Sequence, residues 1–297
     1  MSIDKEMLLA KCDFFVEAQL WPTHRTLDFQ GWLQNFEEDE METAVLLLSH
    51  FIYYSNELTQ QLFRYAISKL VSQVCDFSMP SAQAQWDEFT KNVLVTHVTG
   101  EDPNPSDSGY HFSRMSRQIV GVEPTQIVTN EEAIERLSFG DSRAVIFVDD
   151  FVGSGKQFCE TWDRTHGFGN PARHESFSTV TENAQVDVAT FYCPVICTWK
   201  GNAAIKRRAP RVNVLAAHDI DESYSVFSEA CRFWPAEYVQ KIESDIRKAS
   251  KRAGIGRDWR GFNDLGLTIA FEHCIPDATI PLFWHESRNW VPLKKRS

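Results

Sequence analysis

The feature that most constrains this chain is one segment in its middle, residues 145–157, which reads VIFVDDFVGSGKQ. Its first four residues are apolar and predict a buried strand that ends in two neighbouring carboxylates, Asp149 and Asp150. The small-residue loop Gly153–Gly155 follows, and we expect a helix to open behind it. Ligands of open α/β sheets bind at the carboxyl ends of the strands. The segment therefore predicts a ligand site in an α/β fold.

Each part of this segment suits one part of a phosphorylated sugar. In a loop of small residues, backbone N–H groups can close on a phosphate, which then lies at the positive end of the helix. Two adjacent carboxylates suit the paired hydroxyls of a sugar, or a divalent metal held by that sugar. The segment therefore predicts a pocket for a ribose 5-phosphate, with Asp149 and Asp150 at the sugar. The residues expected at the phosphate are Gly153, Ser154, Gly155, Lys156 and Gln157.

Other motifs with known chemistry do not fit the chain. A Walker A loop needs glycine where Asp150 stands and serine or threonine where Gln157 stands, and a dinucleotide fingerprint needs glycine where Phe158 stands. The nine histidines have no metal-ligand spacing, and no Gly-x-Ser-x-Gly elbow supports serine hydrolysis. The seven scattered cysteines favour buried reduced thiols over a disulfide framework or a zinc site. We therefore assign no residue as a metal ligand.

The surrounding sequence predicts an α/β fold with a parallel sheet, because strand-like and helix-like stretches alternate from about residue 90. The expected strands are 93–98, 144–148, 186–196 and 212–216, and the expected helices between them are 110–119, 130–137 and 202–209. Helical spacing also runs over 8–16, 44–74 and 224–253, and strand-like runs lie at 265–271 and 280–284. We expect three regions: an N-terminal helical region (1–88), a core (89–220), and a C-terminal helix and strand elaboration packed on the core (221–297).

At these residues the segment resembles the phosphoribosyl-diphosphate-binding motif of the type I phosphoribosyltransferases. In that family an apolar strand runs into two acids, two apolar residues, and a small residue followed by Thr or Ser, Gly, Gly and Thr. The resemblance implies that Asp149 and Asp150 are the catalytic residues that face the ribose 2- and 3-hydroxyls. It implies that the backbone of Gly153–Gln157 holds the 5-phosphate, and that Mg²⁺ enters with the ligand. The expected core is then phosphoribosyltransferase-like.

A narrower resemblance covers nearly the whole chain. The flanks of the core are similar to phosphoribosyltransferase-like proteins predicted in bacterial conflict (anti-phage) systems. The stretches that carry this likeness are Trp32–Phe36, Ser108–Arg117, Pro281–Trp284 and Trp290–Leu293. The likeness implies helices ahead of a transferase-like core, and a protein that is a component or effector of such a defence system.

Two departures from the enzymes bear on activity. Lys156 and Gln157 stand where the enzymes have a second glycine and a threonine, so Lys156 either adds a cation to the phosphate or closes the cradle by its bulk. The stretch 99–105, which corresponds to the pyrophosphate-binding loop of the enzymes, holds acids and no base. A carboxylate beside pyrophosphate is repulsive, and bound Mg²⁺ reverses that sign. Arg114 and Arg117 either supply the missing charge or are ordinary surface arginines.

Charge is spread unevenly along a chain whose formal net charge is −11. Residues 1–140 carry 9 basic and 21 acidic side chains, whereas residues 201–297 carry 16 and 12. An acidic protein is a poor general binder of nucleic acid, but the basic C-terminal third keeps nucleic acid or an acidic protein open as a partner. The acidic run 37–40 is either a solvated helix start or a contact for a basic partner, and the acidic N-terminal third can also dock on the basic C-terminal third. Without a signal peptide or a membrane-spanning run, we expect a cytoplasmic protein with no membrane partner.

Three classes of function remain open. The first is a protein that binds phosphoribosyl diphosphate or a nucleotide with Mg²⁺ in a bacterial defence system, with or without phosphoribosyltransferase activity; the intact acid pair favours it. The second is a catalytically inactive module that senses a nucleotide or contacts partner proteins, which the missing basic pyrophosphate loop favours. The third is a nucleic-acid-binding subunit that uses the basic clusters 206–211 and 247–260.

Overall fold

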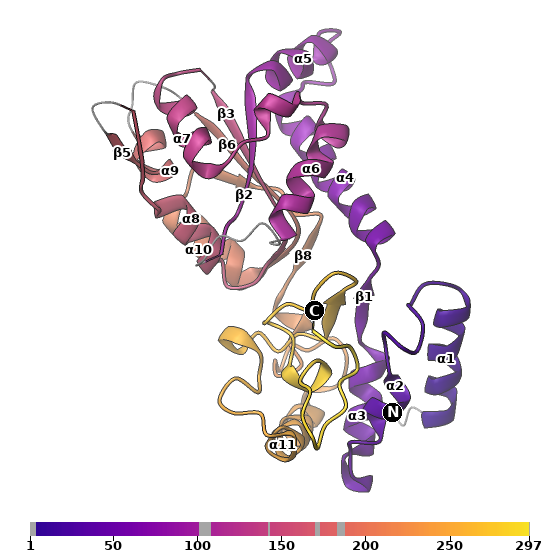
Figure 1. The fold of residues 1–297 in the computed structure, drawn as a ribbon. Helices are drawn as coiled ribbons and strands as arrows, with labels where there is room; N and C mark the ends of the chain where they lie inside the picture. The colour runs from indigo at the N-terminus through magenta and orange to yellow at the C-terminus, as the bar shows by residue number, and fades with distance from the viewer. Residues whose placement is uncertain (1–3, 101–107, 142, 170–172, 183–187, 297) are drawn as a thin grey trace. The chain divides into compact units, whose positions relative to one another are not determined.

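The computed structural model describes residues 4–296, apart from 101–107, 142, 170–172 and 183–187, and the chain forms two compact units (Figure 1). We call residues 1–59 with 220–297 the terminal unit, and residues 60–219 the sheet unit. The three regions expected from the sequence are grouped differently here, because segments from both ends of the chain share the terminal unit. Within the terminal unit, the two end segments are joined by a parallel strand pair, β1 (Ile52–Tyr54) with β9 (Ile269–Phe271).

The sheet unit confirms the predicted α/β fold with a parallel sheet. Its strands lie in the order β2-β3-β6-β7 with every neighbouring pair parallel, and β8 also pairs with β6. The strands are β2 (Val93–His97), β3 (Ala144–Val152), β6 (Ala189–Thr198), β7 (Val212–Val214) and β8 (His218–Ile220). The strands β2, β3 and β6 are almost wholly buried, as expected of apolar parallel strands covered on both faces.

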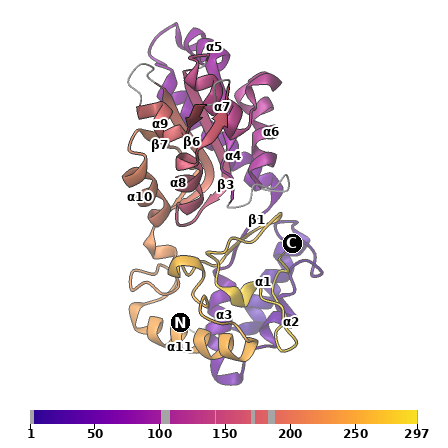
Figure 2. The ribbon, with the colours of Figure 1, turned by 60° about the vertical axis from the view of Figure 1, so that its left-hand side comes forward.

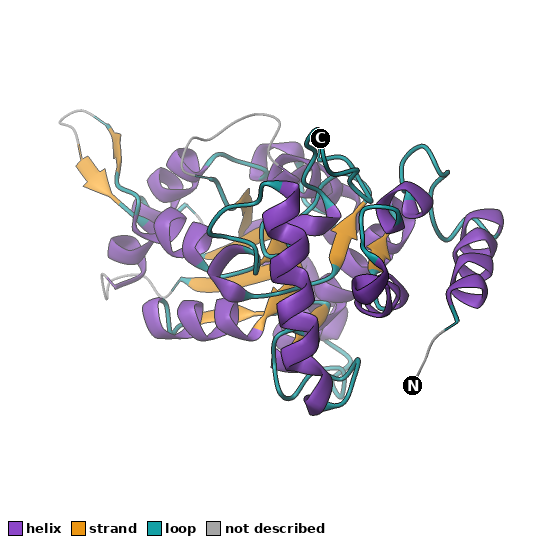
Figure 3. Ribbon diagram, turned by 90° about the horizontal axis from the view of Figure 1, so that it is seen from below, coloured by secondary structure: helices purple, strands orange, loops and turns teal. Residues whose placement is uncertain are grey.

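Helices cover both faces of this sheet (Figure 2). On one face α6 packs on β2 and β3, and its Phe112 meets Phe63 of α4. On the other face α7 to α10 close over a core that contains Phe147, Phe158 and Tyr192. The helices of this part are α4 (Asn56–Val74), α5 (Ala82–Asn92), α6 (Ser108–Val120), α7 (Asn130–Ser138), α8 (Lys156–Asp163), α9 (Phe177–Glu182) and α10 (Trp199–Arg208). Strands β4 (His166–Phe168) and β5 (Arg173–Glu175) form a short antiparallel pair (Figure 3).

The terminal unit is held together by residues that lie far apart in the sequence. Its helices are α1 (Lys5–Glu17), α2 (Phe29–Leu33), α3 (Met41–Ser49) and α11 (Ala236–Ala253). The indole N–H groups of Trp32 and Trp290 both donate to the carbonyl oxygen of Leu282, at 2.7 and 2.9 Å. The side chain of Asn35 forms two hydrogen bonds with the backbone of Val291, at 2.8 and 2.9 Å. Three of the four flanking stretches, Trp32–Phe36, Pro281–Trp284 and Trp290–Leu293, therefore meet in this unit, whereas Ser108–Arg117 lies in the sheet unit.

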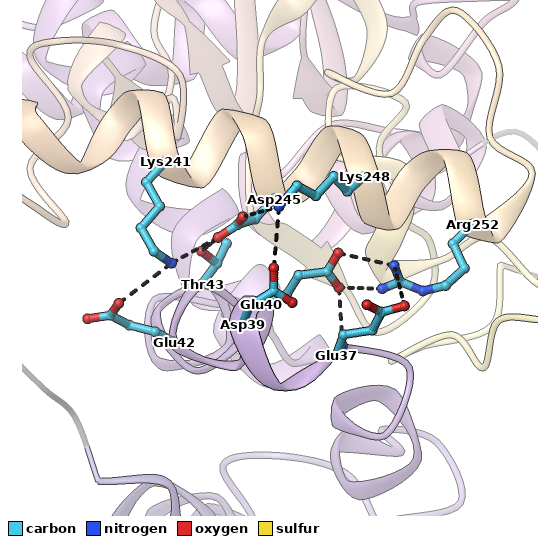
Figure 4. Close-up of polar contacts among 9 residues, drawn as sticks. All are labelled: Glu37, Asp39, Glu40, Glu42, Thr43, Lys241, Asp245, Lys248 and Arg252. Carbon is cyan, nitrogen blue, oxygen red and sulfur yellow. Dashed lines mark hydrogen bonds and ion pairs between the residues drawn. The ribbon is translucent and has the colours of Figure 1, made fainter.

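The acidic run Glu37–Glu40 packs against the basic helix α11 (Figure 4). Glu40 is 1% exposed and accepts hydrogen bonds from both terminal nitrogens of the Arg252 guanidinium. Asp39 pairs with Lys248 at 3.4 Å. The run lies at the start of α3 with Glu37, Glu38 and Asp39 exposed, as expected of a solvated helix start. It also docks on the basic C-terminal third through Glu40 and Asp39.

A second buried acid of the terminal unit is paired in the same way. Asp245 of α11 is 4% exposed and accepts a hydrogen bond from the Thr43 hydroxyl at 2.6 Å (Figure 4). It accepts another from the Lys241 ammonium group at 2.9 Å, and Lys241 also pairs with Glu42 at 3.6 Å. Each of these two buried acids thus has a cation within hydrogen-bonding distance.

Three local predictions outside the core are wrong. The helical spacing over 44–74 spans two helices, α3 and α4, with strand β1 between them, because β1 pairs with the distant β9. The helix expected from residue 224 begins only after Pro235, since proline cannot continue the hydrogen-bond ladder of a helix interior. The strand expected over 280–284 is a 3₁₀ turn, because Pro281 has the fixed φ that suits a first helical position.

Among the described residues, no helix has both the length and the apolar character to span a membrane.

Candidate functional site

The acid pair lies inside strand β3 rather than just beyond its end. The last residues of β3 pair with β6, with Asp149 opposite Pro194 and Val152 opposite Cys197. The strand expected to end at Val148 therefore continues to Val152, since β6 supplies hydrogen-bond partners for it. Both acids of the pair are only 6% exposed. They are held by the rigid central part of the sheet, near its carboxyl edge.

Asp149 is a buried acid held by neutral donors. Its Oδ1 accepts a hydrogen bond from the backbone N–H of Asp150 at 2.9 Å, and its Oδ2 accepts one from the Tyr192 hydroxyl at 3.0 Å. Burial raises the pKa of Asp149 well above its ordinary value, and the neighbouring carboxylate of Asp150 raises it further. In the part of the chain that the structure describes, no lysine, arginine or histidine forms an ion pair with Asp149. The described residues therefore supply no counter-charge to this carboxylate.

The loop Gly153–Gly155 turns the chain from β3 into α8 within a few residues. Gly155 has a φ of 76°, in the left-handed region that glycine enters without strain. The backbone N–H of Lys156 donates to the Ser154 hydroxyl at 3.3 Å, and α8 begins at this residue. The first N–H groups of a helix have no helical acceptors and carry partial positive charge. The loop and helix start therefore have the form expected of a phosphate cradle.

Two residues of the neighbouring element, Thr198 and Gly201, fix this loop, and sequence reasoning missed both. The Thr198 hydroxyl donates to the carbonyl oxygen of Gly153 at 2.5 Å and accepts from the N–H of Gly201 at 3.1 Å, which caps α10. A Cβ atom on Gly201 would lie 2.7 Å from the Gly153 carbonyl oxygen. The loop therefore touches the start of α10 backbone to backbone. A threonine three residues before a helical glycine was the available signal, since it predicts an N-cap.

The side chains of Lys156 and Gln157 are exposed on the first turn of α8. The Lys156 ammonium group lies 3.4 Å from the carboxylate of Glu160, one turn along the helix. The Nε2 atom of Gln157 lies 3.9 Å from the position that a Cβ atom would take on Gly100. All the residues predicted at the sugar and at the phosphate thus lie on one continuous strand, loop and helix turn.

The stretch 99–105 is described only at its first two residues, and the other five fall outside the described part of the chain. Arg114 and Arg117, which were candidates for the missing positive charge, are exposed on α6. A third arginine, Arg164, which sequence reasoning did not single out, donates to the carbonyl oxygen of Gly100 at 2.9 Å. The chain where it leaves β2 therefore has a cation in contact with it, supplied from the end of α8.

The donor chemistry of the acid pair fits Mg²⁺, which prefers hard oxygen ligands. Both oxygens of Asp149 already accept hydrogen bonds within the protein, so the pair does not form a closed protein cage for a metal. Burial disfavours the charged form of Asp149, which forms no ion pair with the described residues. Such a site suits a cation that arrives with an anionic ligand.

The fold and this segment define a class of protein. A parallel sheet whose strand β3 carries two acids and continues through a glycine loop into α8 is the arrangement of a phosphoribosyltransferase-like α/β protein. Residues 29–296 match the PRTase-CE family, and the chain belongs to that family. The match begins in the terminal unit and extends to its end, so both units are part of the family domain. A search of the curated proteins finds no match.

Proposed function

We propose that this chain binds a phosphoribosyl compound, either phosphoribosyl diphosphate or a nucleotide, with Mg²⁺ at the β3–α8 segment. In this proposal Asp149 and Asp150 accept hydrogen bonds from the ribose hydroxyls, and Gly153–Gln157 hold the 5-phosphate. The protein then acts as a component or effector of a bacterial anti-phage defence system. Membership of a phosphoribosyltransferase-like family supports the ligand class, and the likeness of the flanking stretches to proteins predicted in such systems supports the role.

The observation that carries the proposal is the buried acid in β3. An acid buried for the sake of the fold is normally paired with a cation, as Glu40 is with Arg252. Among the described residues, the donors to Asp149 are an N–H and a hydroxyl group, and burial raises its pKa. Ribose hydroxyls would add donors at the acid pair, and a ligand-borne Mg²⁺ would add the positive charge.

Transfer of the phosphoribosyl group is one activity of such a site. An acceptor nucleophile would form a bond to the anomeric carbon while the bond from that carbon to the diphosphate oxygen breaks. The diphosphate leaves with the electron pair of the broken bond, and the acceptor gives up a proton. The acids would hold the sugar and the loop its phosphate, so the rate would come from orientation and electrostatic stabilisation of a cationic sugar.

A non-catalytic module that senses a nucleotide is the second candidate. One observation favours it: the stretch 99–105 contains acids and no base. Nucleic acid has less support, because much of the basic C-terminal third is already paired. Arg208 pairs with Asp163, and Lys248 and Arg252 pair with the acidic run of the terminal unit.

Titration calorimetry with phosphoribosyl diphosphate and Mg²⁺ tests the proposal. The double variant Asp149→Asn/Asp150→Asn is expected to bind at least about tenfold more weakly than the wild type, since it loses charge-assisted hydrogen bonds to the sugar. Asp141→Asn removes an exposed acid of the same unit and serves as the matched control, with unchanged affinity expected.

Release of pyrophosphate then separates the two candidates. Release by the wild type that the double variant lacks supports the transferase, whereas binding without release supports the sensor. A wild-type chain that binds neither phosphoribosyl diphosphate nor a nucleotide, or a double variant that binds as well as the wild type, would show that the proposed site is wrong.

A further inference from the structure

A cavity of about 430 Å³ lies within the terminal unit, just beyond the end of α11. Its lining comes from residues 254–258, which follow α11, from the turn that contains Phe262, and from the segment 277–285. Sites for small molecules in proteins measure about 300–1,000 Å³. The cavity therefore has room for a small-molecule ligand, and none of the residues predicted at the sugar or the phosphate lines it.

One aromatic residue of the lining, Trp284, is half-buried and fixed in its orientation. Its indole N–H donates to the carbonyl oxygen of Thr279 at 3.2 Å. The guanidinium carbon of Arg296 lies 4.8 Å from the centroid of its ring, and Arg296 pairs with Asp277, another lining residue, at 2.5 Å. Because the polar edge of the indole already has its acceptor, Trp284 contributes ring surface to the cavity.

The second aromatic residue of the lining, Phe262, is 42% exposed, although burial of a large apolar ring lowers the free energy. The two residues that follow it, Asn263 and Asp264, have φ angles of 55° and 52°, in the left-handed region that residues other than glycine rarely enter. The backbone N–H of Phe262 donates to the carbonyl oxygen of Asp277 at 2.8 Å, which ties this turn to the opposite part of the lining. Such backbone strain is concentrated at ligand sites. The fold therefore keeps the ring of Phe262 at the cavity in spite of strain.

Two charged residues of the lining, Arg257 and Asp258, are exposed and have no charged partner. In the part of the chain that the structure describes, neither side chain forms an ion pair or a hydrogen bond. The other acid of the lining, Asp277, differs from Asp258 because it is paired with Arg296. The cavity thus offers one carboxylate and one guanidinium to a ligand, together with two aromatic rings.

These groups match the parts of a guanine nucleotide. Nucleobases stack on aromatic side chains and are recognised by hydrogen bonds to their Watson–Crick edge. A carboxylate only accepts hydrogen bonds, and guanine is the common base whose Watson–Crick edge has two neighbouring N–H donors, at N1 and N2. A guanidinium binds phosphate through paired hydrogen bonds.

We propose that this cavity is a second ligand site, which binds a guanine nucleotide. The base lies against Phe262 and Trp284 and donates from N1 and N2 to the carboxylate of Asp258, while Arg257 donates to the phosphate. The inference does not rest on the proposed function, because neither the acid pair nor the loop Gly153–Gly155 takes part in it.

Titration calorimetry with guanosine monophosphate tests this site. The full chain carries Asp149→Asn/Asp150→Asn, so that a nucleotide held at the β3–α8 segment does not contribute to the signal. This chain is expected to bind one guanosine monophosphate, and to bind adenosine monophosphate at least about tenfold more weakly, because adenine places an acceptor opposite Asp258.

Three further substitutions in this chain assign the contacts. Asp258→Asn and Phe262→Ala are each expected to weaken binding of guanosine monophosphate about tenfold, since one loses a charged acceptor and the other a stacking surface. Arg257→Gln is expected to weaken guanosine monophosphate about fivefold and guanosine less than twofold, because guanosine has no phosphate. The matched controls are Glu237→Gln and Arg247→Gln, which change exposed charged residues of α11 that do not line the cavity, and unchanged affinity is expected.

The site is wrong if the chain with Asp149→Asn/Asp150→Asn does not bind guanosine monophosphate, or binds adenosine monophosphate equally well. It is also wrong if Asp258→Asn leaves the affinity unchanged. A thermal melt checks the fold of each variant, and if Phe262→Ala unfolds, the exposed positions Arg257 and Asp258 decide. Failure of phosphoribosyl diphosphate to bind the wild type would overturn the proposed function and leave this site standing.

Discussion

The terminal unit and the sheet unit differ in whether their buried or half-buried charged side chains pair with a side chain of opposite charge. In the terminal unit Glu40 and Asp245, 1% and 4% exposed, each have a cation of α11 as a partner. In the sheet unit Asp149 is 6% exposed and has neutral donors, while Arg164 donates to neutral oxygens. Because an unpaired buried charge costs free energy, the first arrangement stabilises a fold, and the second is where we expect a ligand to complete the charge balance.

Removal of a cation from the terminal unit is expected to have the largest effect. Arg252→Ala leaves Glu40 buried without its guanidinium and should lower the free energy of unfolding by about 3 kcal/mol. Urea denaturation followed by circular dichroism measures the change. Lys251→Ala, at an exposed position next to it in α11, is the control and should cost less than about 0.5 kcal/mol. Equal effects of the two substitutions would contradict the importance of the buried pair.

A methyl group between the loop Gly153–Gly155 and α10 should have the next largest effect. Gly201→Ala places Cβ 2.7 Å from the carbonyl oxygen of Gly153, so the loop must move, at a cost of about 1–3 kcal/mol in stability. Thermal unfolding measures the cost, and titration with phosphoribosyl diphosphate should show weaker binding. At Gly256 an added Cβ meets no atom within 4 Å, so Gly256→Ala should have little effect on either. If Gly201→Ala changes neither the thermal stability nor the binding, the contact with α10 does not fix the loop.

Neutralising the buried acid of the sheet unit should act in the opposite direction to Arg252→Ala. Asp149→Asn removes a charge that burial disfavours, and we expect it to raise the free energy of unfolding by about 1 kcal/mol while it weakens ligand binding. Denaturation and titration of the same preparation measure both. A loss of stability would mean that Asp149 supports the fold, like the acids of the terminal unit.

The smallest expected effect is the pH dependence of the stability that Asp149→Asn is expected to add. Because the pKa of Asp149 is raised in the folded chain, the folded state holds this proton longer than the unfolded state does. The resulting stabilisation is fully present below about pH 4 and is lost as the pH rises through the raised pKa. The difference in melting temperature between Asp149→Asn and the wild type should therefore be smaller at pH 4 than at pH 8. If this difference in melting temperature does not change with pH, the pKa of Asp149 is not raised in the folded chain.

The sheet unit could be predicted from the sequence where its signals are local. Apolar runs, turn residues and helix spacing indicated β2, β3, β6, α6, α7 and the start of α8, because each depends on neighbouring residues. Helix α9 was not predicted. The segment from Asp149 to Gln157 was predicted for the same reason, since its acids, loop and helix start are contiguous. Thr198, Tyr192 and Arg164 were not, because each reaches the segment from another element, and only the three-dimensional register brings it there.

The terminal unit could be predicted only in part. The uneven charge indicated that the acidic N-terminal third can dock on the basic C-terminal third, and Glu40 with Arg252 shows such a contact. The pairing of β1 with β9 had no local signal, because three-residue strands carry little periodicity. For the same reason the helical spacing over 44–74 concealed the strand that interrupts it.

The pairing of β1 with β9 has a consequence for biosynthesis. A ribosome that adds ~5–20 residues per second needs on the order of ten to forty seconds between the two strands. Through that interval the nascent terminal unit has an unpaired strand edge, which is a template for aggregation. All of the sheet unit is synthesised before β9, so a chain that stops short of β9 would keep the acids and glycine loop of β3 and α8 but could not complete the terminal unit.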